Sequence, residues 1–453
     1  MASTTTPLLE RADAALAAKN TVEAERLYKE VLGTSSGSTT DTSVQQQQVR
    51  DQEKALVKLG ELYRDQKNAQ ALSTVISQSR AFMASTTAKA KTAKLIRSLL
   101  DFFAAIPDSQ DVLKQTLVEN IEWAKKEKRI FLKHSLETRL VGLYIDTLAY
   151  RPALAMIDTL LTELKRLDDK MILTEVHLLE SRVYRGIGSW AKAKAALTSS
   201  RTAANAIYCP PLLQAQLDLQ SGVLHAEDKD YTTAYSYFFE AFEGLENNIG
   251  GEDKKGDGKE ALGALKYMLL CKVMLNLPED VNNLLTIKLA TRYAHSRDVE
   301  SMRAIARAHQ DRNLQEFERV LREYRAELSS DPTIRSHLAS LYDNLLEQNL
   351  LRIIEPYSTV EIAHVAELVG QERQGVEAKL SQMILDKVFH GVLDQGRGCL
   401  LVFDEPEVDK AYGAAIETLE EVGKVVQSLY AKVRFSFWLG WSRAGWDADV
   451  GYV

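Results

Sequence analysis

Apolar side chains recur at steps of three and four residues through most of this chain. Residues 137–148, ETRLVGLYIDTL, are typical of the pattern. Steps of this size place the apolar side chains on one face of an α-helix. The pattern runs from Leu8 to about Glu327 and predicts a long series of amphipathic helices.

A second, longer period lies on top of the first. An aromatic residue followed three positions later by alanine occurs at steps of 40 and 41 residues, at Tyr150/Ala153, Trp190/Ala193 and Tyr231/Ala234. The small alanine lets two antiparallel helices approach closely, and the aromatic ring fills the gap between neighbouring hairpins. The pattern resembles tetratricopeptide repeats, stretched beyond their usual period of about 34 residues. We expect an all-α solenoid of such hairpins over residues 1–230, although chance recurrence in an alanine-rich helical protein is the alternative.

Two polar, low-complexity stretches interrupt the helical pattern. Residues 33–48 read GTSSGSTTDTSVQQQQ, and residues 247–260 read NNIGGEDKKGDGKE. Neither stretch carries enough apolar side chains to form a packed element. We therefore predict a flexible loop in each place.

The pattern changes after Asp331-Pro332, because proline lacks the backbone donor that a continuing helix needs. A helix is predicted from Ser336 to Ile354. Ser358 and Glu361 have the spacing of a capping box, which predicts the start of a second, short helix. A third helix is expected over residues 371–387.

A strand-turn-strand follows, with strands predicted at residues 389–393 and 399–403 and a glycine-rich turn between them. Three helices followed by a two-stranded wing are typical of a winged helix, here over residues 333–404. The charges of the third helix sum to zero: Glu372, Arg373, Glu377, Lys379, Asp386 and Lys387. A helix that reads DNA needs a basic side facing the groove, so this sequence argues against nucleic-acid binding.

The last predicted helix spans residues 408–433, within a segment 405–433. Its apolar positions form one face: Tyr412, Ala415, Ile416, Leu419, Val422, Val426 and Leu429. We expect helices of partner proteins to cover this face in a bundle. Beyond it, residues 434–453 carry Trp438, Trp441 and Trp446 among glycines without helical spacing, and we expect an atypical, disordered tail.

Composition narrows the class of protein. The chain has 453 residues, a net charge of −7 and three cysteines, Cys209, Cys271 and Cys399. The acidic balance argues against binding to nucleic acid or to acidic membranes. Three widely separated cysteines do not form a disulfide framework, which indicates a reducing compartment, the cytoplasm or nucleus. No apolar run reaches the length of a membrane span, and no signal peptide is recognised.

Candidate chemistry is weak throughout. None of the eight histidines forms an H-x-H or H-E-x-x-H pair, so a zinc hydrolase site has no ligands at the required spacing. The stretch 251–259 only faintly resembles a P-loop, because Glu260 stands where serine or threonine must hold magnesium. Cys271 lies in an apolar helix, where a thiol behaves as a small buried apolar group. We therefore predict no catalytic residue, cofactor or metal.

Several longer segments resemble one family. LYDNLLEQNLLRIIEPYS, KLSQMILDKVFHGVLDQG and VFDEPEVDKAY resemble the PCI-domain subunits of the 26S proteasome lid. The resemblance extends from about Lys89 to Val433.

The resemblance implies a fold and a role. It implies a solenoid, then a PCI domain over residues 231–404 that combines helical repeats with the winged helix, then a bundle helix over 405–433. The role it implies is a non-catalytic scaffold that joins other lid PCI subunits and clamps the ATPase ring to the α-ring of the 20S core. The first alternative is a paralogous PCI subunit of the signalosome. The second, less favoured alternative is a winged-helix protein that binds nucleic acid.

Two basic clusters are candidate contacts with those partners. The first is Lys89, Lys91, Lys94 and Arg97, and the second is Lys125, Lys126, Lys128 and Arg129. Each could be an ordinary solvated face. Each could instead dock on acidic patches of the core particle or the ATPases, an interaction that salt would weaken.

Overall fold

The computed structural model describes residues 5–18, 20–33, 42–83, 89–106, 109–249, 258–329, 331–404 and 410–444. The chain divides into two compact units. The first comprises residues 1–307 and 326–334, and the second comprises 308–325 and 335–453.

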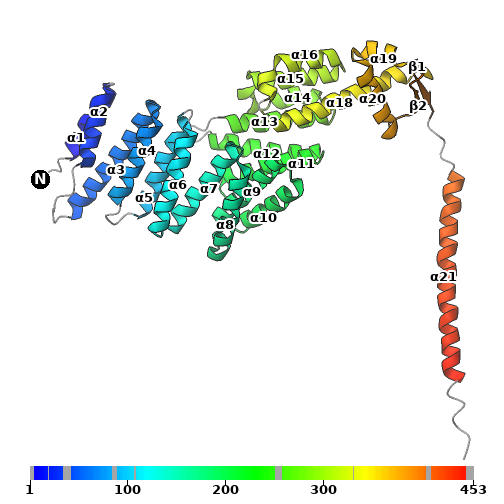
Figure 1. Cartoon of the computed structure of the whole chain (residues 1–453), viewed down its shortest axis with the longest axis horizontal. Helices are drawn as coiled ribbons and strands as arrows, with labels where there is room; N and C mark the ends of the chain where they lie inside the picture. Colours follow the sequence, from blue (N-terminus) through cyan, green and yellow to red (C-terminus); the bar gives the residue numbers. More distant parts are fainter. Residues whose placement is uncertain are drawn as a thin grey trace, which may run out of the picture. The chain divides into compact units, whose positions relative to one another are not determined.

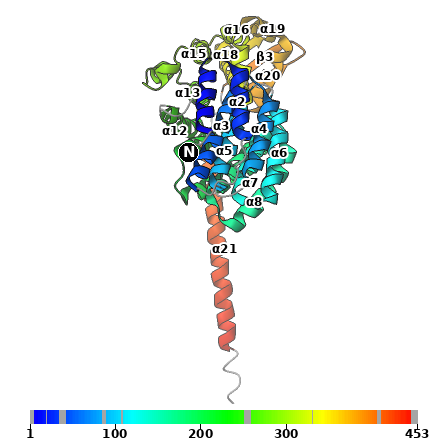
Figure 2. The same ribbon diagram turned by 90° about the vertical axis from the view of Figure 1, so that its left-hand side faces the viewer.

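The first unit is built from α-helices that pack in chain order (Figures 1 and 2). Its helices are α1 Thr5–Ala17, α2 Thr21–Gly33, α3 Thr42–Asp65, α4 Ala69–Met83, α5 Lys89–Asp101, α6 Gln110–Lys126, α7 Ile130–Asp146, α8 Tyr150–Leu167, α9 Lys170–Ile187, α10 Trp190–Asn205, α11 Pro211–Glu227, α12 Tyr231–Ile249, α13 Lys259–Met274 and α14 Glu279–Leu285. The 3₁₀ turns Phe102–Ala105 and Ala290–Tyr293, most of α15 Arg297–Gln310, and most of α17 Arg325–Ser329 also belong to it. The predicted all-α solenoid of hairpins is confirmed.

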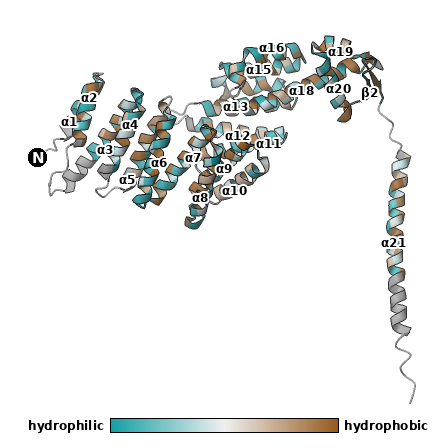
Figure 3. Ribbon diagram, viewed as in Figure 1, coloured by the Kyte–Doolittle hydropathy of each residue, from teal (hydrophilic) through white to brown (hydrophobic). Residues whose placement is uncertain are grey.

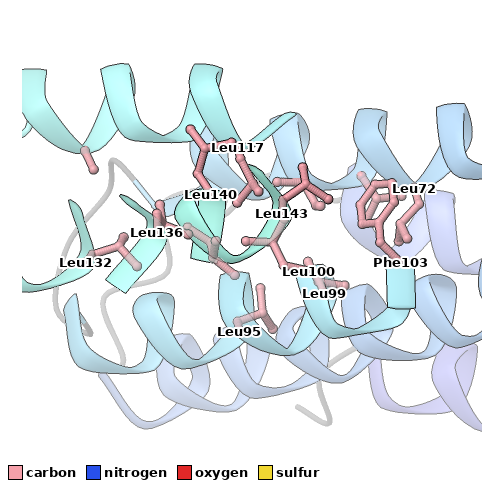
Figure 4. Close-up of a cluster of buried hydrophobic side chains, with 14 of the residues drawn as sticks. Leu72, Leu95, Leu99, Leu100, Phe103, Leu117, Leu132, Leu136, Leu140 and Leu143 are labelled. Carbon is pink, nitrogen blue, oxygen red and sulfur yellow. The ribbon is translucent and has the colours of Figure 1, made fainter. Parts of the chain in front are cut away.

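One continuous apolar core links the first nine helices. Leucines from α4 to α7 interdigitate there with Phe103 of the first 3₁₀ turn (Figure 4). Most helices carry polar residues as well as apolar ones (Figure 3), as the three- and four-residue steps in the sequence require.

The 40-residue period marks equivalent places in three hairpins. Tyr150, Trp190 and Tyr231 are each the first residue of the second helix of a hairpin. The alanines three positions later are fully buried: Ala153, Ala193 and Ala234. A Cβ at Gly186 of α9 would lie 2.5 Å from the Tyr150 ring, so this ring fills the space between its hairpin and the next.

Helices extend into both of the polar stretches that were predicted as loops. The helix α3 begins at Thr42, so the glutamine run of the first stretch is helical. This part of the loop prediction is wrong because glutamine is a good helix former. In the second stretch, α12 continues to Ile249 and α13 begins at Lys259. Residues 34–41 and 250–257 lie outside the described residues.

The second unit contains the winged helix. It includes α16 Leu314–Glu323, most of α18 Pro332–Ile354, β1 Thr359–Glu361, α19 Ile362–Val369, α20 Arg373–Leu385, β2 His390–Asp394 and β3 Cys399–Phe403. The strands form an antiparallel sheet in the order β1-β3-β2. Leu400 of the central strand pairs with Val360 and Leu393 and is fully buried.

The capping-box prediction is wrong, and it hid the third strand of the wing. The carbonyl of Ser358 accepts a hydrogen bond from the Val402 amide at 2.9 Å. Glu361 pairs with Cys399 in the sheet and is itself the N-cap of α19. Ser358 therefore leads into a strand, because the sheet satisfies the backbone groups that a cap would otherwise serve.

A tyrosine joins the helices of this unit. The hydroxyl of Tyr342 on α18 donates to Glu318 of α16 at 2.9 Å and is also bonded to the amide of Gln371. Burial, reinforced by the Glu318 carboxylate, raises the pKa of Tyr342 to about 12. The hydroxyl therefore stays protonated and keeps donating at neutral pH.

The last helix, α21, runs from Lys410 to Ala444. The expectation that helical structure ends near residue 433 is wrong, since residues 434–444 continue the same helix. Residues 445–453 lie outside the described part of the chain. The predicted boundary at residues 230/231 stays a prediction, and α12 packs on both α11 and α13. No helix in the described ranges combines the length and the apolar character needed to cross a membrane.

Candidate docking surfaces

The helix α21 presents an uncovered apolar face. Tyr412, Leu419, Val426 and Val433 follow one another at seven-residue steps and are 72, 71, 58 and 64% exposed. Ile416, Val422 and Leu429 widen the same face and are also exposed. A seven-residue apolar repeat is the pattern of helices that wind around other helices in left-handed bundles. Figure 3 shows apolar residues along this helix.

The five bundle candidates named from the sequence all belong to this exposed face: Tyr412, Ile416, Leu419, Val426 and Leu429. Each side chain is at least half exposed. An exposed apolar face of this length marks an interaction site in a soluble protein. Its role as a bundle contact stays a prediction.

The first basic cluster lies on α5. Lys94 and Arg97 are exposed. The side chains of Lys89 and Lys91 lie outside the described residues. Lys94 and Arg97 are therefore accessible to a partner. The docking role of the cluster stays a prediction.

The second basic cluster lies at the end of α6 and in the turn before α7. Lys125, Lys126 and Lys128 are exposed. Arg129 differs from them, because its guanidinium lies 4.8 Å from the centre of the Trp123 ring and its Nη1 is buried without a hydrogen-bond partner. The three lysines are thus available for a partner, whereas Arg129 packs against the Trp123 ring of α6.

The helix in the position that reads DNA in other winged helices has no basic face. Lys379 of α20 is largely buried and forms an ion pair with Glu347 at 2.8 Å. Val376, Leu380 and Met383 of the same helix are buried in the core. This geometry agrees with the neutral charge of the segment and gives no support to nucleic-acid binding.

The thiols are not activated for chemistry. Burial raises the pKa of Cys271 to about 12. Burial, followed by the nearby carboxylates Asp218 and Glu175, also raises the pKa of Cys209. A nucleophilic cysteine needs a lowered pKa, so neither thiol has the environment of a catalytic residue.

One polar cluster was not foreseen from the sequence. Possible ligand atoms of His134 and Glu137 on α7 and of Glu163 on α8 lie within 4.8 Å of one another. The Lys133 ammonium lies 2.7 Å from the Glu163 carboxylate and 3.7 Å from that of Glu137. This ammonium already supplies the positive charge that a metal ion would bring.

The histidine of this cluster also argues for a structural network. Its Nε2 lies 3.0 Å from Glu163, while its Nδ1 is buried without a partner. A histidine that binds metal normally donates its second ring N–H to an acceptor. The hydrogen bond from Lys133, followed by that from His134, lowers the pKa of Glu163. The cluster is therefore an ion-pair network that joins α7 to α8. The three-residue spacing of His134 and Glu137 was visible in the sequence. Glu163 lies on the next helix, too far along the sequence to be linked to them by spacing.

Comparison with known proteins follows the same division of the chain. The model of the 26S proteasome regulatory subunit RPN6 N-terminal domain matches residues 5–147. A PCI domain model matches residues 321–404, and the model of the RPN6 C-terminal helix domain matches residues 408–434.

Curated relatives match nearly the whole chain. The probable 26S proteasome regulatory subunit rpn6 of Schizosaccharomyces pombe is 52% identical over 93% of this chain and 96% of its own. The 26S proteasome regulatory subunit RPN6 of Saccharomyces cerevisiae is 44% identical over 94% and 97%. The chain belongs to the RPN6 family. An Arabidopsis thaliana protein named 26S proteasome non-ATPase regulatory subunit 11 homolog is 47% identical over 86% of this chain and 91% of its own.

The RPN6 assignment bears out the resemblance seen in the sequence. The residues that match the RPN6 C-terminal helix domain, 408–434, include the exposed apolar face of α21. Beyond residue 434, where that match ends, α21 of this chain continues to Ala444.

Proposed function

We propose that the chain is a non-catalytic scaffold subunit of the 26S proteasome lid. In this role it clamps the regulatory particle, with its ATPase ring, to the 20S core and supports lid assembly for ubiquitin-dependent degradation. The single observation that carries the proposal is the exposed apolar face of α21, in a chain whose relatives are named proteasome regulatory subunits.

The architecture supports this role because each part offers a different kind of surface. The solenoid supplies a long series of packed helices, the winged helix has strands at the edges of its sheet, and α21 has an exposed apolar face. Several modest interfaces in one chain act together through their high effective concentration. The proposed partners are other PCI subunits of the lid, the ATPase ring and the α-ring of the 20S core.

The proposed location is the cytoplasm and the nucleus. The thiols of Cys209, Cys271 and Cys399 are all free, as is usual in a reducing compartment. Fluorescent tagging of the chain at its own locus would test this part of the proposal.

Purification through a tag on the chain, followed by crosslinking mass spectrometry of the native assembly, tests the proposal as a whole. We expect crosslinks from α21 to helices of other lid subunits, and crosslinks from the solenoid to the ATPases or the core particle. Copurification with signalosome subunits instead of proteasome subunits would contradict the proposal. Recovery of the chain alone would contradict it as well.

A further inference from the structure

A groove of about 630 Å³ lies on the face formed by the first helices of successive hairpins. Its walls come from α5, α7, α9 and the start of α11. The volume falls within the usual range for sites that bind small molecules or short peptide segments. Arg97 also belongs to the first basic cluster, but no other residue of the groove belongs to the surfaces described above.

Two arginines on the groove wall lack a partner. Among the described residues, Arg97 and Arg182 make no hydrogen bond and no ion pair, although both line the groove. Only Arg139, the third guanidinium there, is paired, with Asp101 at 2.6 Å. Arginine presents a planar fork of donors that fits a carboxylate in two-point contact.

The second carboxyl group of the groove makes no ion pair with either arginine in the described chain. Burial, followed by repulsion from Asp169, raises the pKa of Glu175, and a longer-range attraction to Arg97 opposes that rise. Burial also lowers the pKa of Arg182, whose interactions with Glu260 and Asp146 are only longer-range attractions. A half-buried guanidinium without a counter-ion costs free energy, and an incoming carboxylate would recover it.

The rest of the wall is apolar. Leu136, Leu178 and Leu213 are buried residues of the lining, and Leu212 at the start of α11 is 42% exposed. Gln216 adds an amide that has no hydrogen bond in the described chain. Anion-binding groups and leucines therefore stand side by side along one groove.

We propose that this groove binds an extended acidic peptide segment of a partner protein. Carboxylates of the segment pair with Arg97 and Arg182, and an apolar side chain of the segment packs on Leu212. The apolar wall favours a peptide over a small inorganic anion, and the helical repeats supply the kind of extended surface that solenoid proteins use for binding. The proposal concerns the groove alone and does not depend on the assembly in which the chain works.

Fluorescence anisotropy with the purified full-length chain tests this proposal. The probe is a fluorescein-labelled pool of octapeptides in which glutamate or aspartate alternates with leucine, valine or phenylalanine. The matched pool carries glutamine and asparagine in place of the acids. We expect saturable binding of the acidic pool, weakening with added salt, and binding of the amide pool that is weaker by about tenfold or more.

Substitutions locate the binding. Arg182→Gln and Arg97→Gln should each weaken binding of the acidic pool by about tenfold. Leu212→Glu should weaken it too, because it places a like charge beside the segment. Arg151→Gln is the matched control, since Arg151 is an exposed arginine of α8 outside the groove, and it should leave binding unchanged.

Thermal unfolding of each variant shows whether the fold is retained. If Arg182→Gln does not fold, Arg97→Gln still tests the proposal, because Arg97 is exposed. Equal binding of the two pools would overturn the proposal. Acidic-pool binding that survives both arginine substitutions, or that falls equally in Arg151→Gln, would also overturn it.

Discussion

The ring of Phe238 on α12 rests against the backbone of Gly222 on α11. A Cβ at residue 222 would lie 2.7 Å from two atoms of that ring. Phe238 is only 1% exposed, so the ring has little room to move away. The two helices of this hairpin can approach so closely because residue 222 has no side chain.

Gly222→Ala is therefore expected to destabilise the protein. The added methyl overpacks a filled interface, which costs about 1–3 kcal/mol. Chemical denaturation with circular dichroism would measure the loss.

Gly142→Ala provides the control for that experiment. A Cβ at residue 142 of α7 would meet no atom of the described chain within 4 Å. Alanine there should raise stability by about 0.5–1 kcal/mol through its helix propensity. Equal effects of the two substitutions would contradict the packing explanation.

The ion-pair network between α7 and α8 predicts a pH dependence. Lys133 and His134 lower the folded-state pKa of Glu163, so the carboxylate binds a proton less readily in the folded chain than in the unfolded one. Its contribution to stability is therefore present above the ordinary glutamate pKa of about 4.3 and is lost as the pH falls through the lowered value.

Glu163→Gln should reduce stability at neutral pH by less than about 1 kcal/mol, because the Glu163 side chain is 46% exposed and solvent screens the pair. The gap between wild type and variant should close in acid, as measured by thermal unfolding at several pH values. Glu122→Gln, an exposed change on α6, should leave the profile unaltered. A stability difference between wild type and variant that grew in acid would contradict the predicted direction of the pH dependence.

The apolar face of α21 predicts a separation between folding and assembly. Leu419 and Val426 are exposed in the isolated chain, so Leu419→Glu with Val426→Glu should leave its unfolding temperature unchanged. The same pair should reduce incorporation into the regulatory particle by about tenfold or more, because buried apolar anchors dominate interfaces.

Ser428→Glu is the matched change on the opposite side of the helix, where the serine hydroxyl bonds to the Val425 carbonyl. It should leave incorporation intact. The measurement is the fraction of tagged chain recovered in the particle after coexpression. Equal losses for both sides of α21 would rule out a specific face.

The sequence predicted what depends on local pattern. The strand at Cys399–Phe403 and the helices that begin at Tyr150, Trp190 and Tyr231 follow from periodicity and turn residues. The strand at Thr359–Glu361 was missed because its pairing partner is about 40 residues away and because Ser358 and Glu361 have the spacing of a capping box.

The candidate sites divide in the same way. Most of the apolar face of α21 was predicted, because one helix carries all of it, although Val433 was not named. The groove was not, because Arg97 and Arg182 come from helices far apart in the sequence, and only folding brings them to one wall. Arg129 was placed in a docking cluster by charge alone, and the ring of Trp123 beside it became evident only in three dimensions.

The central claim is that this chain contributes surfaces that hold a larger assembly together. Its most direct test is to deplete the chain from cells and to resolve proteasomes on native gels stained for peptidase activity. We predict that particles capped by the regulatory complex disappear, that free 20S core accumulates, and that the wild-type chain restores capping. Normal amounts of fully capped proteasomes in the depleted cells would contradict the account.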